Sequence, residues 1–288
     1  MVITVHAWRN PIMRSLPLLL LPVLSLPLLA QETPRTQKDW AEAGMRKTVT
    51  EPRSGIQFPV VLPAAGTKNK HLLVGAGLRT KTIFGIKVYA MGFYLDPDRA
   101  GSELVQFKQT NSKRLAKDGM FYKKLMDAKL DKSIRLVMAR DVDAEDMREA
   151  FDDSLRPAVR KVASGAEQEG GMEALKKFRS LFKEELRKGD ELVFSMVGGV
   201  LYTTHNRREL GPIQSPTLGR ALFEIYLGQD PVSSKARKNF YAGLPQFFER
   251  VQEYRRLKNA GVQSETGGEV QSTEDTPAGE VGTEGKDG

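Results

Sequence analysis

Arg79 and Tyr89 are the two side chains of this sequence whose types and spacing point most clearly to chemistry. They lie ten residues apart in the stretch from Leu73 to Asp96, which is rich in β-branched and aromatic residues and punctuated by glycines. That composition predicts two strands joined by a turn. Along one straight strand the two residues would be about 33 Å apart. If the chain reverses around Phe84-Gly85, they become cross-strand partners with Cβ atoms roughly 5 Å apart.

A guanidinium and a phenol brought together in this way would form a site for a small carboxylate. Arginine presents a planar fork of donors that matches a carboxylate, and a tyrosine hydroxyl can add a further hydrogen bond. Lys87 precedes Tyr89 by two positions, so on a regular strand it shares the same face and would add positive charge. The alternative is that Arg79 is a solvated charge at a strand edge and Tyr89 a core aromatic residue with a solvated hydroxyl.

Other kinds of site find little support in the sequence. A dinucleotide-binding loop would need a third glycine at Thr80, and it would lead into a helix rather than a second strand. His71 and His205 are isolated and cysteine is absent, so no metal site and no cofactor are expected. Ser195 or Ser215 could meet His205 in space, but no nucleophile-elbow motif accompanies either serine. We therefore expect no catalytic residue of these classes.

The two ends of the chain differ from its middle. Residues 1–30 place Arg9 and Arg14 before an apolar run that three prolines interrupt, which is typical of a secretory signal and predicts export to a periplasm or beyond; an uncleaved membrane anchor is the alternative. Residues 31–54 are expected to be a polar leader with a short helical turn at Trp40–Met45. One domain is expected over residues 55–259. Residues 260–288 carry seven acidic residues against one lysine, which predicts a disordered acidic tail.

Charge and cysteine content narrow the possible partners. The formal charge of +8 becomes about +12 for the expected domain once both ends are removed, so the folded body is basic. Its basic pairs are scattered over many elements and export is expected, so nucleic acid is not a predicted partner. An anionic membrane surface is a more reasonable target for this charge. Because no cysteine is present, stability must come from packing rather than disulfides.

The order of the expected elements indicates an α+β fold. Besides the central hairpin, strands are expected at Phe58–Leu62, Leu104–Phe107, Ile134–Arg140, Leu192–Met196 and Val200–Thr204. Helices are expected from Asp143 to Val162 with a bend at Pro157, from Gly170-Gly171 to about Gly189, from Ser215 to Gly228, and from Ser233 to Lys258 with a kink at Pro245. A basic, partly helical connection is expected over Asn111–Lys132. This order predicts a mostly antiparallel sheet with helices packed on one face.

Two blocks of the sequence resemble the chalcone isomerase-like family, which includes plant fatty-acid-binding members. The first block joins Gly75–Arg79 to Lys87–Asp96, and the second runs from Ile213 to Ser233. The resemblance covers about residues 55–258. It implies an open-faced sandwich with a largely apolar cleft between the sheet and the helices.

The resemblance leaves a choice between an isomerase and a binding protein. Family isomerases use the arginine matched here by Arg79, a threonine where this chain has Tyr89, and a lysine, a tyrosine and an asparagine further on. An ungapped overlay brings Ala139, Met147 and Ser154 to those last three positions, so efficient chalcone cyclisation is not expected. The fatty-acid-binding members use an arginine and a tyrosine in this hairpin to hold a carboxylate.

The sequence therefore predicts an exported, non-catalytic protein that binds a fatty acid or a similar amphiphilic carboxylate through Arg79 and Tyr89. Ser215 and Thr217, at the start of a helix, are expected to line the pocket, although Ser215 has an adequate alternative role as a helix cap. Two other readings stay open. One is an isomerase or intramolecular lyase that acts on an unknown substrate, and the other is an envelope structural or interaction protein with a vestigial cleft.

Overall fold

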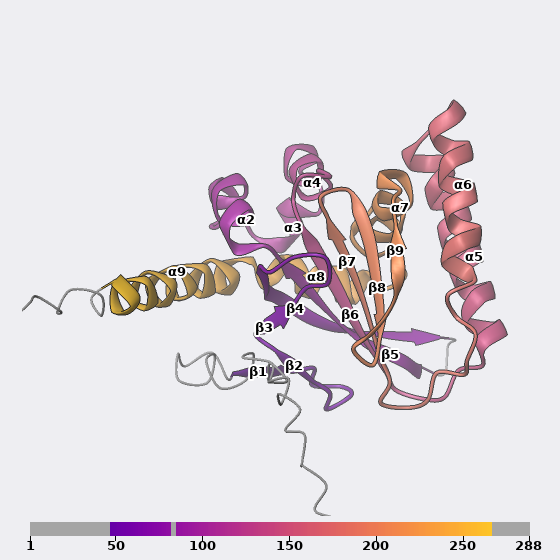
Figure 1. Cartoon of the computed structure of the whole chain (residues 1–288), viewed down its shortest axis with the longest axis horizontal. Helices are drawn as coiled ribbons and strands as arrows, with labels where there is room; N and C mark the ends of the chain where they lie inside the picture. The colour runs from indigo at the N-terminus through magenta and orange to yellow at the C-terminus, as the bar shows by residue number, and fades with distance from the viewer. Residues whose placement is uncertain (1–46, 82–84, 267–288) are drawn as a thin grey trace, which may run out of the picture.

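A curved antiparallel sheet forms the centre of the molecule, with helices over one of its faces (Figure 1). The computed structural model describes residues 47–81 and 85–266. Seven strands follow one another in sequence order, each antiparallel to the next. They are β3 (Val61–Pro63), β4 (Lys70–Lys81), β5 (Ile86–Leu95), β6 (Lys132–Met138), β7 (Glu191–Val197), β8 (Val200–His205) and β9 (Arg208–Ile213). The predicted α+β class with an antiparallel sheet is confirmed.

The second face of the sheet carries a small cover of its own. Strands β1 (Thr48–Thr50) and β2 (Gln57–Pro59) pair as a separate hairpin. Phe58 of this hairpin is fully buried in a cluster with Leu73 and Tyr94 of the sheet. Because β1 lies within the stretch predicted to be a polar leader, the folded part begins before residue 55.

The helices occur in three groups along the chain. After β5 come α2 (Pro97–Glu103), the short 3₁₀ turn η1 (Val105–Phe107), α3 (Ser112–Leu115) and α4 (Gly119–Leu125). After β6 come α5 (Ala144–Val162) and α6 (Gly165–Arg179). After β9 come α7 (Pro216–Leu227), α8 (Ser234–Ala242) and α9 (Leu244–Thr266). The main apolar cluster lies between these helices and the sheet.

Helix α7 shows why this sequence folds as it does. The Ser215 hydroxyl accepts from the backbone N–H of Leu218 (3.2 Å), Pro216 occupies the first turn, and Gly228 follows the last residue, so both ends are encoded locally. Nine of its twelve residues are buried, because α7 packs against the sheet on one side and against α5 and α6 on the other. A helix held this way can position a side chain rigidly against the sheet.

Several predicted boundaries were wrong. Leu104 and Phe107 are buried three residues apart while Val105 is exposed, which suits a 3₁₀ turn and not the predicted strand. Helix α6 begins at Gly165 and ends at Arg179, so Gly170-Gly171 lie inside it. The predicted last helix is two helices separated at Gly243, and the second continues to Thr266, past the expected start of the tail. Helix α5 includes Pro157 without a break in its helical span, and the bend expected there stays a prediction.

Some predictions fall outside the described residues. The signal sequence, the turn at Trp40–Met45 and residues 267–288 of the tail belong to this group. Among the helices that the structure describes, none combines the length and the apolar character needed to span a bilayer.

Candidate functional site

The hairpin of β4 and β5 places Arg79 directly opposite Tyr89. Arg79 Nη1 donates a hydrogen bond to Tyr89 Oη across 2.9 Å, and the guanidinium carbon lies 5.5 Å from the centre of the tyrosine ring. Tyr89 is 3% exposed and belongs to the main apolar cluster, so the pair faces the helices. The chain reversal predicted near Phe84-Gly85 takes place between Lys81 and Ile86, where Gly85 has a φ of 67°.

A second tyrosine reaches this pair from α7. Tyr226 is 1% exposed, and burial, followed by the interaction with Tyr89, holds its pKa well above the ordinary value for tyrosine. Arg79 also interacts with it. The Tyr226 hydroxyl makes no hydrogen bond of regular geometry with the described residues. It is therefore a protonated, buried donor beside the Arg79–Tyr89 pair. Tyr226 was not among the residues predicted for the site, although its position four residues after Leu222 on the buried stripe of a helix was a usable signal.

Helix α8 lies along β4 next to this group. A Cβ atom added at Gly77 would lie 2.5 Å from the Cβ of Ala236, so only glycine permits this close approach. The Ser233 hydroxyl, which caps α8, donates to the backbone oxygen of Leu78 (3.0 Å). The N-terminal end of α8 is therefore fixed beside Arg79.

The charge of Arg79 has no acidic partner in the described part of the chain. No described carboxylate oxygen lies within 4.0 Å of its guanidinium. Burial opposes its charge, but the interactions with Tyr89 and Tyr226 outweigh this effect and keep the pKa of Arg79 above its ordinary value. A partly buried cation held by two neutral phenols can accept a carboxylate as its counterion. The described residues contain no group of three or more acidic or histidine side chains suited to a metal ion.

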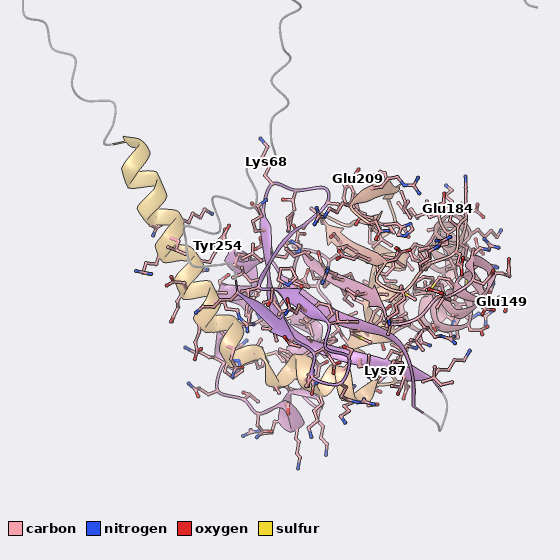
Figure 2. The ribbon with its side chains drawn as sticks, turned by 90° about the horizontal axis from the view of Figure 1, so that it is seen from below. Lys68, Lys87, Glu149, Glu184, Glu209 and Tyr254 are labelled. Atoms are coloured by element: carbon pink, nitrogen blue, oxygen red, sulfur yellow. The ribbon has the colours of Figure 1, made fainter. Side chains whose placement is uncertain are left out.

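Lys87 does not join this group. The pairing register shifts between Arg79 and Thr80, so Thr80 faces Lys87 and Val88 is left without a cross-strand partner. This bulge places Val88 and Tyr89 in the same apolar cluster and turns Lys87 away. The Lys87 ammonium donates to the backbone oxygen of Arg53 in the turn between β1 and β2. In Figure 2 Lys87 lies near the turn end of the β4–β5 hairpin, exposed to solvent. The prediction that Lys87 shares the face of Tyr89 was wrong.

Ser215 and Thr217 lie at the far end of α7 from Tyr226. Eleven residues separate Ser215 from Tyr226, which is about 16 Å along a helix. Ser215 is occupied as the cap of α7. The methyl group of Thr217 packs at Gly171 of α6, where an added Cβ would come within 2.7 Å of it. The structure therefore brings Arg79 and Tyr89 together but does not bring these two residues to them.

The three positions at which family isomerases carry polar residues offer no acid here. Ala139 donates its backbone N–H to the oxygen of Val88 (2.9 Å) and so lies beside the site, but it has no functional group. Met147 is buried in the apolar cluster. The Ser154 hydroxyl donates to the backbone oxygen of Ala150 (2.8 Å) within its own helix.

Two hollows on the described surface lie away from the Arg79–Tyr89 pair. One hollow is lined by residues 113–118. A second lies between residues 180–186 and 205–210. Neither includes Arg79 or Tyr89. Both tyrosines of the site are packed into the main cluster between the sheet and the helices, whereas Arg79 is only half-buried. The apolar cleft beside them stays a prediction.

Comparison with known proteins places this arrangement in a family. The model of the family described as "Chalcone isomerase like" matches residues 69–241, a span that includes Arg79, Tyr89 and Tyr226. The chain belongs to the chalcone isomerase-like family. The resemblance inferred from the two sequence blocks is thereby confirmed.

Relatives in this family carry two kinds of name. Fatty-acid-binding protein 1 of Arabidopsis thaliana is 30% identical over 203 residues, which cover 67% of this chain and 69% of that protein. Chalcone–flavanone isomerase 2-B of Glycine max is 22% identical over 71% of this chain and 94% of its own length. The crystal structure of an Arabidopsis thaliana fatty-acid-binding protein superimposes with a TM-score of 0.59 at 26% identity, covering 70% of this chain and 99% of that one. The chalcone isomerase-like fold of this chain is thus shared with proteins named for fatty-acid binding.

Proposed function

We propose that this chalcone isomerase-like protein binds a fatty acid or a similar amphiphilic carboxylate and does not transform it. The observation that carries the proposal is the guanidinium of Arg79, which is partly buried, lies beside two phenols and has no described carboxylate partner. A ligand carboxylate would accept hydrogen bonds from Arg79 and from the hydroxyls of Tyr89 and Tyr226. Hydrogen bonds to a charged group contribute about 1.5–3 kcal/mol each.

The acyl chain would lie between the sheet and the helices. Met91 follows Tyr89 on the same face of β5, and Leu222 lies one turn before Tyr226 on α7, so the surfaces next to the polar group are apolar. The similarity to the Arabidopsis fatty-acid-binding protein supports this ligand class.

Isomerase chemistry has weaker support. Cyclisation of a chalcone needs a positioned acid and stabilisation of a developing anion. Ala139, Met147 and Ser154 supply neither at the positions where the family isomerases carry polar residues. We therefore expect no conversion when the purified protein is incubated with a chalcone.

Calorimetric titration of the purified, delipidated protein with dodecanoate tests the binding proposal. Arg79→Met keeps an unbranched stem but removes the guanidinium with its charge and donors, so binding should weaken by about 10- to 100-fold. Lys87→Ala is the matched control, because it removes a neighbouring cation on the other side of the hairpin, and it should leave the affinity unchanged. Equal affinities of wild type and Arg79→Met would refute the proposed head-group site. Loss of binding in the Lys87→Ala variant alone would refute it too.

Export is part of the same proposal and rests on the sequence of residues 1–30. The intact mass of the protein recovered from its host tests it. A mass that corresponds to a chain beginning near Gln31 supports removal of a signal, and a full-length mass contradicts it.

A further inference from the structure

Residues 105–124, in the first group of helices, are strongly basic. Six lysines and arginines occur there against one acidic residue, Asp118. The Asp118 carboxylate already accepts the backbone N–H of Phe121 (2.9 Å) as the cap of α4. Lys124 is also occupied, because it pairs with Glu103 at 2.7 Å. The remaining positive charge of this segment is therefore not balanced locally.

Four exposed cations of the segment form no ion pair with any described residue. They are Lys113, Arg114, Lys117 and Lys123. A shallow hollow lies among the first three. Exposed lysines without a carboxylate partner also occur elsewhere on the described surface. This segment differs in its charge balance, since six basic residues stand against one capped aspartate within twenty residues.

Helix α8 extends the same surface. The rings of Phe121 in α4 and Tyr241 in α8 meet edge to face at 5.2 Å, and α3 packs against α8. Helix α8 contains no acidic residue and exposes Lys235 and Lys238. We call the surface formed by residues 105–124 and α8 the basic face.

The basic face also exposes apolar side chains. Val105 is 53% exposed and Met120 is 61% exposed, and they are two of the three large apolar side chains that the described residues expose. Their segments are adjacent, because the rings of Phe107 and Phe121 contact each other at 5.2 Å. Exposed apolar side chains next to exposed cations are the combination that an interfacial lipid contact uses.

We propose that the basic face binds the surface of an anionic phospholipid bilayer. The exposed lysines and arginines would lie against the lipid head groups, and Met120 and Val105 would enter between them. A nucleic acid fits this face less well, because bases stack on exposed aromatic rings and the aromatic side chains here are engaged. Phe107 and Phe121 are buried, and the Tyr122 hydroxyl donates to Glu224.

Helix α8 connects the basic face to the candidate site. Helix α8 packs on β4 at Gly77 and reaches Leu78 through Ser233, next to Arg79. The same helix therefore borders the candidate site and contributes to the basic face. The binding of the face to a membrane does not depend on the proposed ligand.

Co-sedimentation with lipid vesicles tests this inference on the purified full-length protein. Vesicles of phosphatidylcholine with about 30% phosphatidylglycerol should sediment the protein, and pure phosphatidylcholine vesicles should not. Binding should be lost in about 0.5 M NaCl, where exposed charges are screened. Insertion through the apolar run of residues 16–30 would add the same binding to neutral and to anionic vesicles, so the measured quantity is the salt-sensitive excess of binding on the anionic vesicles.

The decisive comparison is between two triple variants with the same change in charge. Lys113→Glu/Arg114→Glu/Lys117→Glu should weaken binding to anionic vesicles by about tenfold or more. Lys177→Glu/Lys183→Glu/Lys188→Glu alters exposed lysines in and after α6, a helix that stands apart from α3 in Figure 1, and should keep most of the binding. Met120→Ser should reduce binding without altering its dependence on salt.

Three results would overturn the inference. The first is equal loss of binding in both triple variants, which would mean that net charge alone matters. The second is equal binding of the wild type to neutral and anionic vesicles. The third is retention of the wild type by single-stranded DNA but not by anionic vesicles, which would assign the face to a different polyanion.

Discussion

Arg79 brings a full positive charge to the interface between the sheet and the helices, and the neighbours that the structure gives it are tyrosines. Its meeting with Tyr89 could be predicted, because two residues ten positions apart around a turn become cross-strand partners. Tyr226 could not be placed by the same reasoning, since its approach depends on how α7 packs on the sheet. Local spacing determines pairs within a hairpin, whereas a third group from a distant helix requires the tertiary structure.

The two tyrosines of the site should differ in what their hydroxyls contribute to stability. Tyr89→Phe removes the acceptor of a hydrogen bond from Arg79 and should lower the free energy of unfolding by about 1–3 kcal/mol. Tyr226→Phe removes a buried hydroxyl that has no regular hydrogen bond, so it should leave stability within about 0.5 kcal/mol of wild type or raise it. Urea denaturation measures both changes.

Dodecanoate binding adds a second measurement for the same two variants. If both hydroxyls donate to the ligand carboxylate, each variant should bind more weakly than wild type, although only Tyr89→Phe is less stable. A Tyr226→Phe variant that loses stability but binds normally would show that the hydroxyl has a structural partner and no part in the site.

Among the secondary-structure elements, the bulge at Val88 of β5 decides which side chains share a face of the β4–β5 hairpin. Alternation along a regular strand predicts Lys87 beside Tyr89, and the unpaired Val88 reverses that prediction. Nothing in the residues from Ile86 to Tyr89 marks the bulge, because its position is set by the pairing of β4 with β5. The helix starts, by contrast, were largely predictable, since Ser215, Ser233 and Asp143 each cap a helix with a side-chain acceptor.

Adjacent glycines in α6 offer a matched test of how α6 and α7 pack. A Cβ added at Gly170 meets nothing within 4 Å, so Gly170→Ala should stabilise the protein by up to about 1 kcal/mol through helix propensity. A Cβ added at Gly171 would lie 2.7 Å from the Thr217 methyl carbon and 2.9 Å from a methyl carbon of Val159. Gly171→Ala should therefore destabilise by about 1–3 kcal/mol.

A second substitution identifies the cause of that loss. Thr217→Ser removes the methyl group that meets Gly171, so it should restore part of the stability of Gly171→Ala in thermal denaturation. The Gly171→Ala/Thr217→Ser double variant should bind dodecanoate as the wild type does, because Thr217 packs on α6 at a distance from Arg79. Weaker dodecanoate binding in a fully folded double variant would instead indicate that Thr217 lines the ligand pocket.

For the whole molecule, the class of fold and most of the sheet followed from the sequence. The hairpin of β7 and β8 was marked by Gly198-Gly199, whose φ angles of 55° and 85° suit a tight turn. Two parts could not be predicted. The β1–β2 hairpin is held by the burial of Phe58 against the sheet. Strand β9 has only six residues, including Gly211 and Pro212, which are uncommon inside strands. Both are stabilised by contacts distant in sequence.

Two buried titratable groups should make the stability of the folded chain depend on pH. His71 is fully buried, with Nδ1 2.8 Å from the Ser133 hydroxyl and Nε2 without a partner among the described residues. Burial, and next the charge of Lys132, lowers the pKa of His71 to about 3. Lys132 is 2% exposed, and burial lowers its pKa to about 7 although two backbone oxygens accept its hydrogen bonds. Both groups are therefore easier to protonate in the unfolded chain.

The sign of the effect follows from the order of the pKa values. Between pH 6.5 and about 3 the unfolded chain binds a proton at His71 that the folded chain does not, so the contribution of His71 to stability is complete above pH 6.5 and is lost as the pH falls. The slope is about 1.4 kcal/mol per pH unit. For Lys132 the same reasoning gives stability that rises from about pH 7 to pH 10.5.

Variants separate these two groups from the acidic residues that also titrate. We expect His71→Gln to be less stable than wild type at pH 7 and to lose less stability than wild type as the pH falls from 6 to about 4. Lys132→Met should flatten the rise in stability between about pH 7 and 10 while leaving the acid limb steep. Urea midpoints measured across this range give both slopes. Parallel curves for wild type and His71→Gln below pH 6 would mean that His71 becomes protonated in the folded protein, and hence that water reaches the unpartnered Nε2 atom.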